Sequence, residues 1–142
     1  MNIETMIEIL NQDLKNEWMH LKFYLYHASA VVGLHCEEYK EIFLKEAASE
    51  MEHVTQFSDV IRGLGGQSTY LSNEFTTHTN PVDIIRCALA MEEEVVSNYT
   101  NRIKDAQDLG GTDGQWLEIF LESQIEKSRE DVDHYKQILR GI

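Results

Sequence analysis

Apolar side chains at helical spacing are the feature that most constrains what this chain can fold into. They recur at helical spacing in four long segments, beginning near residues 3, 39, 85 and 117. That spacing places them on one face of an α-helix. The chain contains a single proline, Pro81, and proline is the residue that most strongly interrupts a helix. The sequence therefore predicts an all-α fold of four long amphipathic helices.

Glycine and proline mark the expected ends of these helices. The first helix should end near Gly33, and the second should stop at the segment GLGG, because glycine readily adopts the backbone conformation of a helix C-terminus. Asn80 followed by Pro81 predicts the start of the third helix, with a capping residue and then proline in the first turn. The segment DLGGTDG should end the third helix, and the fourth should run from about Gln115 to the C-terminus.

Residues 67–80, QSTYLSNEFTTHTN, are polar and show no periodicity, so they predict a long connection between the second and third helices. The other two links are short. This pattern predicts a four-helix bundle with one long crossover, in which the second and third helices run parallel to each other. With 142 residues, the chain is expected to form a single domain over residues 1–142.

The charge balance and the cysteines exclude several classes of function. A formal net charge of -13 argues against a nucleic-acid-binding surface, which requires clustered basic residues. No signal segment opens the chain, and no apolar run approaches the roughly 20 residues that span a bilayer. Cys36 and Cys87 match no metal-finger or redox spacing and are expected to be free thiols. We therefore expect a cytoplasmic protein without nucleic-acid or membrane partners.

Three of the predicted helices direct a carboxylate toward the core: Glu17, Glu50 and Glu92. A buried carboxylate is costly unless it is paired or coordinates a cation, and few basic residues share these faces, so a metal ion is the best compensator. His53 follows Glu50 by three residues, which places both side chains on one helix face. Carboxylate and imidazole together suit iron, manganese or zinc better than calcium.

The fourth helix leaves its contribution to such a site open. The centre of its apolar stripe contains Gln124, Ser128 and Asp131, and no Glu-x-x-His pair occurs in phase with that stripe. Further candidates on this helix are Glu126, Glu130 and Asp131 with His134.

Segments from all four helices resemble the ferritin family. These segments are NEWMHLKFYLYHA, EMEH, CALAMEEEV and LESQIEKSREDVDHY, and the likeness is to non-haem ferritins, with bacterioferritins as the nearest cousins. By this resemblance, the ligands of a dinuclear non-haem iron site are Glu17, Glu50, His53, Glu92 and Gln124, with Tyr24 hydrogen-bonding nearby. The resemblance implies a ferritin-like fold, a homo-oligomer, and oxidation of Fe(II) by O₂ or H₂O₂ for iron storage or detoxification.

Some features differ from the family pattern. Bacterioferritins carry Glu-x-x-His on the fourth helix, which this chain lacks in register. Met51 falls where their haem-ligating methionine occurs, although packing is the commoner role of a helical methionine. The sequence ends soon after the fourth helix, so we expect no fifth helix of the kind that many ferritins place around a cage axis. Whether a storage cage forms is therefore left open.

Two other functions fit the same residues. One is a di-iron oxidase or peroxidase of the rubrerythrin type, which forms no cage. The other is a metal-free helical interaction module, in which the inward acids pair with Lys22, Lys45 or Arg129. His20 lies one turn beyond Glu17 and could join the site, although a histidine on the helix flank is the commoner case. The sequence identifies no partner for His27, His35 or His78.

Overall fold

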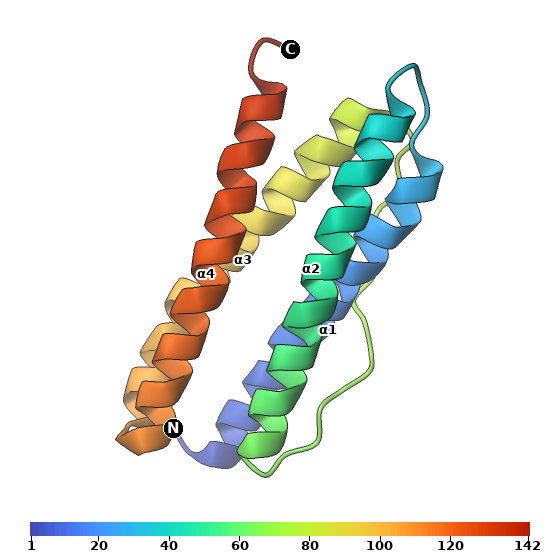
Figure 1. Cartoon of the computed structure of the whole chain (residues 1–142). Coiled ribbons are helices and arrows are strands. Elements are labelled where there is room, and N and C mark those ends of the chain that lie inside the picture. The colour runs from blue at the N-terminus through green and yellow to red at the C-terminus, as the bar shows by residue number, and fades with distance from the viewer. The chain divides into compact units, whose positions relative to one another are not determined.

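The computed structural model describes residues 1–142 and contains four α-helices and no strand (Figure 1). The helices are α1 (Ile3–Ala30), α2 (Cys36–Gly63), α3 (Pro81–Leu109) and α4 (Gly111–Leu139). The predicted all-α class is confirmed. No helix combines the length and the apolar character that crossing a membrane would require.

The chain divides into two compact units. The α1–α2 unit comprises residues 7–84, and the α3–α4 unit comprises residues 85–142 together with residues 1–6. Each unit is a helical hairpin with its own set of buried side chains. The expectation that residues 1–142 form one domain stays a prediction.

In the α1–α2 unit the two helices run antiparallel. The ring of Tyr24 lies 6.4 Å from that of Phe43, near the start of α2. Glu17, earlier in α1, contacts His53, which lies later in α2. Residues of α1 therefore meet residues of α2 in reverse order. Tyr24, Phe43 and Phe57 are fully buried, and they form the apolar part of this hairpin.

The crossover, residues 64–80, lies along α1 in the same direction as the helix. Trp18 Nε1 donates a hydrogen bond to the Thr69 carbonyl oxygen at 3.0 Å. Phe75 packs edge-on against Phe23, further along α1, with ring centroids 5.8 Å apart. Beyond the helix end, the Val32 amide donates to the Thr79 carbonyl oxygen at 3.0 Å. The crossover thus returns the chain to the end of the hairpin where α2 begins, as predicted.

His27 fastens the crossover to α1. Its side chain is fully buried. Nδ1 donates to the Phe23 carbonyl oxygen at 2.8 Å, and Nε2 accepts a hydrogen bond from the His78 amide at 3.1 Å. A neutral imidazole has one donor and one acceptor nitrogen, so the tautomer protonated on Nδ1 satisfies both contacts. His27 and His78, for which no partner was predicted, therefore meet although they lie 51 positions apart in the sequence.

Most of the inner face expected for α1 is buried as predicted, including Met6, Leu10, Leu14, Glu17, Tyr24 and Ala28. The helical spacing also includes Leu25 and Val32, but these side chains are 50 % and 55 % exposed. Two histidines, His20 and His27, are buried as well. Apolar residues occur on more than one side of this helix, so their spacing alone does not select the face that packs against α2 and the crossover.

In the α3–α4 unit, Gly110 alone separates the two helices. Gly110 and Gly111 have φ values of +68° and +67°, a left-handed conformation that glycine adopts without steric cost. The prediction that α4 begins near Gln115 is therefore wrong by four residues. The glycine-rich segment is not a loop, because two glycines suffice to reverse the chain and α4 continues through Gly114.

Burial lowers the pKa of His27 below its usual value of 6.5, and the charge of His78 lowers it further, against the opposing hydrogen bond to Phe23. Below about pH 6.5 the unfolded chain therefore binds more protons than the folded one, and stability is lost as the pH falls. We expect His27→Gln to reduce the loss of urea-unfolding free energy between pH 7.5 and pH 5. The control His35→Gln, at an exposed position, should lose as much unfolding free energy over this pH range as the unsubstituted protein. An equal pH dependence of the unfolding free energy in the two variants would contradict this account.

Gly114 is required by the close approach of α4 to the last turns of α3. A Cβ at this position would overlap the backbone carbonyl oxygen of Ala106, which cannot rotate away as a side chain can. We expect Gly114→Ala to lower the free energy of unfolding by about 1–3 kcal/mol, the usual cost of overpacking. Gly63→Ala is the matched control, because a Cβ there meets no atom within 4 Å. Equal denaturation midpoints for the two variants would refute this role.

Candidate metal centre

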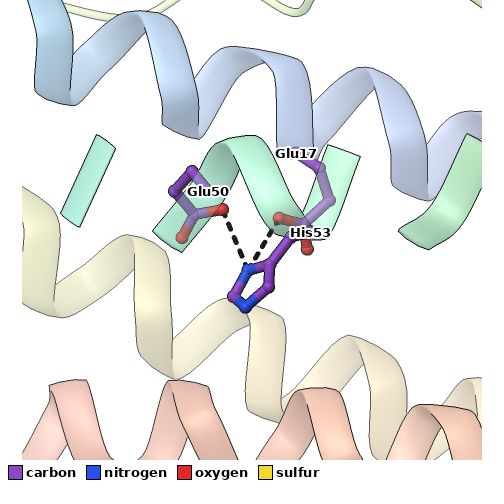
Figure 2. Close-up of side chains that lie close together, drawn as sticks. All are labelled: Glu17, Glu50 and His53. Atoms are coloured by element: carbon purple, nitrogen blue, oxygen red, sulfur yellow. Dashed lines mark hydrogen bonds and ion pairs between the residues drawn. The ribbon is translucent and has the colours of Figure 1, made fainter. Parts of the chain in front are cut away.

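Glu17 of α1 and the pair Glu50 and His53 of α2 point toward one another inside the α1–α2 unit (Figure 2). His53 Nδ1 lies 3.2 Å from Glu50 Oε2 and 3.6 Å from Glu17 Oε2. The three side chains are 2 %, 1 % and 7 % exposed, respectively. One ligand atom from each lies within 4.8 Å of the other two. The antiparallel hairpin therefore brings together three residues that the sequence predicted as metal ligands.

The charges at this centre depend on one another. Burial and the charge of Glu50 raise the pKa of Glu17 to about 6, although the hydrogen bond with His53 opposes this rise. Burial alone would lower the pKa of His53, but hydrogen bonds with Glu17 and Glu50 and their negative charges raise it to about 10. At neutral pH, His53 is thus an imidazolium that partly neutralises two buried carboxylates.

This donor set fits a divalent transition metal. Two ligand atoms, each about 2.1 Å from the same ion, lie about 3–3.4 Å apart, close to the 3.2 Å and 3.6 Å that separate His53 Nδ1 from the two carboxylates. Two carboxylates and one imidazole suit iron, manganese or zinc. An ion would take the place of the His53 proton as the positive charge of the centre.

His20 is buried in the same unit, and its assignment to the helix flank is wrong. Its side chain is 1 % exposed, and its Nδ1 lies 3.9 Å from Glu50 Oε1. Residues 17, 20, 24 and 27 follow one another at steps of three and four, the spacing of a single helix face. That spacing allowed His20 to join the site, but the commoner role of a histidine on a helix flank was preferred.

Tyr24 lies on the same face of α1 as Glu17, about two turns further along. It is fully buried and packs against Phe43 of α2 and edge-on against Phe23, whose centroid is 5.4 Å away. Its expected hydrogen bond near the metal centre stays a prediction.

The predicted residues of the α3–α4 unit are also buried. Glu92 on α3 is 1 % exposed, and Gln124 and Asp131 on α4 are each 4 % exposed. Lys127 Nζ donates to Asp131 Oδ1 at 2.9 Å. The side chains of Glu92, Gln124 and Asp131 therefore face away from solvent. Their role as metal ligands stays a prediction. The remaining candidates on this helix are exposed: Glu126, Glu130 and His134.

The basic residues of the metal-free alternative lie at the surface. Lys22 and Lys45 are exposed, and Arg129 Nε lies 3.1 Å from Asp133 Oδ1. Glu17 and Glu50 are instead buried around an imidazole. Met51 is 57 % exposed, so it does not serve packing in the core of the α1–α2 unit, and its ligation of haem stays untested.

A family model described as a ferritin-like domain matches residues 7–142. The chain belongs to the ferritin-like domain family. Among the curated proteins compared, none matches this ferritin-like protein.

Solved structures confirm the ferritin-like four-helix bundle. A ferritin-like diiron-carboxylate protein from Bacillus anthracis is 24 % identical, with a TM-score of 0.89 over 97 % of each chain. A dodecameric thioferritin, the bacterioferritin-related protein of Bacteroides fragilis, is 16 % identical, with a TM-score of 0.83 over 98 % of this chain and 86 % of the other. A Rhodobacter capsulatus bacterioferritin with a metal-free dinuclear site and haem iron is 19 % identical, with a TM-score of 0.76 over 94 % of this chain and 82 % of the other. At these identities the likeness defines the fold alone.

Metal binding at this centre should release protons, because only a neutral imidazole binds a metal ion. With the pKa of His53 at about 10 and that of Glu17 at about 6, we expect about one proton released per chain near pH 7 and a larger number near pH 5.5. Calorimetric titration with Co(II), in buffers that differ in ionisation enthalpy, measures this number. A release that does not change between the two pH values, or that is absent at pH 7, would contradict the assignment.

Proposed function

We propose that this ferritin-like protein oxidises Fe(II) at a dinuclear site and acts in iron storage or detoxification. The observation that carries the proposal is the buried centre formed by Glu17, Glu50 and His53, whose two carboxylates and imidazole match the ligand types of iron. Membership of the ferritin-like family supports it. The name of the Bacillus anthracis neighbour, a diiron-carboxylate protein, is consistent with it.

Each ligand has a proposed role. Glu17 and His53 would hold one ion and Glu92 the other, with Glu50 or its partner carboxylate shared between them. The family resemblance assigns Glu92 and Gln124 as further ligands and Tyr24 as a nearby hydrogen-bonding residue. On α4, Asp131 is the alternative to Gln124, because both are buried on one face of the helix.

The iron is the substrate, and the protein supplies the surroundings in which it loses electrons. Each Fe(II) gives one electron, and O₂ or H₂O₂ accepts two electrons together with two protons. Glu17 and Glu50 favour the ferric product because two buried negative charges stabilise the ion of higher charge. Gln124, a neutral ligand, holds the ferric ion less strongly, so the oxidised iron can leave for storage.

The assembly separates this proposal from its nearest rival. We propose a homo-oligomer, and the Bacteroides fragilis neighbour is described as dodecameric. A non-cage oxidase or peroxidase of the rubrerythrin type would use the same ligands in a small particle. Size-exclusion chromatography with light scattering, before and after iron loading, distinguishes a large iron-containing shell from a dimer or monomer.

Substituting Glu50 tests the proposed activity. We expect Glu50→Ala and the isosteric Glu50→Gln to slow Fe(II) oxidation at least about tenfold, because each removes a negatively charged ligand. Stopped-flow absorbance of the ferric product under limiting O₂ or H₂O₂ gives the rate. Glu52→Gln is the matched control, because Glu52 is an exposed carboxylate on the same helix and its loss should leave the rate unchanged. An undiminished rate in Glu50→Ala would refute the proposal.

A further inference from the structure

The two carboxylate oxygens of Glu50 face two different imidazoles. Oε2 lies 3.2 Å from Nδ1 of His53, whereas Oε1 lies 3.9 Å from Nδ1 of His20. His20 and Glu50 are each 1 % exposed. Both imidazoles belong to the α1–α2 unit, and each approaches Glu50 through the same type of nitrogen. Glu50 therefore lies between two nitrogen donors from two helices.

The separation between His20 Nδ1 and Glu50 Oε1 is too long for a hydrogen bond. A metal ion about 2.1 Å from each of two atoms holds them about 3–3.4 Å apart, so a shift of about half an ångström would let both atoms bind one ion. A carboxylate that bridges two ions offers one oxygen to each. The ion bound to Oε2 would also be bound by Glu17 and His53. The ion bound to Oε1 would also be bound by His20.

From this geometry we propose that His20 is an imidazole ligand of the second metal ion. The inference rests on the proposed dinuclear site and adds a ligand that neither the sequence motifs nor the family resemblance assigns. It also places one imidazole nitrogen beside each carboxylate oxygen of Glu50. The second nitrogen then comes from α1, since the fourth helix carries no in-phase Glu-x-x-His.

Asn16 gives His20 the support that a metal-bound histidine needs. Asn16 Nδ2 lies 3.4 Å from His20 Nε2, and Asn73 of the crossover donates to Asn16 Oδ1 at 3.5 Å. When Nδ1 binds a metal, Nε2 must carry the proton and requires an acceptor. Turning over the amides of both Asn16 and Asn73 places the Asn16 oxygen beside Nε2 and keeps their mutual hydrogen bond, because the two ends of an asparagine amide are interchangeable in shape. In that arrangement Asn16 supports the tautomer of His20 that binds a metal through Nδ1.

Anaerobic calorimetric titration of the full-length protein with Co(II) tests the proposal. We expect the wild-type protein to bind two ions per chain. His20→Ala should weaken the second ion at least about tenfold while changing the first less than about threefold. His20→Asp, which restores a ligand oxygen, should recover part of the second affinity. His35→Ala, an exposed histidine on the same unit, is the control and should bind as the wild type does. Circular dichroism confirms the fold of each variant.

Solid-state NMR of ¹⁵N-histidine-labelled protein loaded with Zn(II) separates a ligand from a residue that only positions Glu50. A ligand role predicts two metal-bound imidazole nitrogens per chain, one of which is absent from His20→Ala. A His20 that keeps a proton on Nδ1 in the loaded wild-type protein would overturn the proposal without any variant.

The outcomes also separate this inference from the proposed function. A wild-type protein that binds no Co(II), or only one ion per chain, overturns both. Two ions bound equally well by the wild type and His20→Ala overturn only the role of His20.

Discussion

The constraint on which this structure depends is the burial of Glu17 and Glu50 beside each other. Two carboxylates removed from water require positive charge close by, and His53 provides it as an imidazolium whose pKa is raised to about 10. The hairpin can therefore hold its metal ligands in place before a metal binds. The same balance explains why a cation of higher charge would be favoured there, since it replaces one proton with more than one positive charge.

Helix α1 contributes residues both to the candidate metal centre and to the contacts with the crossover. Its inner face carries Glu17 and His20 at the metal centre and His27 at the crossover. Trp18 and Asn16, on the neighbouring side, also contact the crossover. The crossover is therefore more than a connection, because it covers the helix that supplies half of the donors in the α1–α2 unit. A change in the packing of the crossover against Asn16 and Trp18 would displace the ligands on α1, which lie within one helical turn of these two residues.

Much of the fold and part of the candidate site could be predicted from the sequence, because these features are local. Helical periodicity, the Asn80–Pro81 start and the spacing of Glu50 and His53 depend on residues within one or two turns. The start of α4 was misplaced because glycine normally indicates a loop, and the close contact of Gly114 with Ala106 is visible only in three dimensions. His20 was placed on the flank for a similar reason, since its burial and its approach to Glu50 of α2 are visible only in three dimensions.

The sequence by itself determined which donors exist and which share a helix face, because rise and rotation along an α-helix are fixed by the backbone. Only the tertiary structure decided that Glu17 meets Glu50 and His53, 33 and 36 positions away. That meeting depends on the register of the α1–α2 hairpin, which is set by long-range packing such as that of Tyr24 on Phe43. Side-chain packing between helices carries no periodic signature along the chain, so no local pattern could reveal which oxygen of Glu50 faces which imidazole.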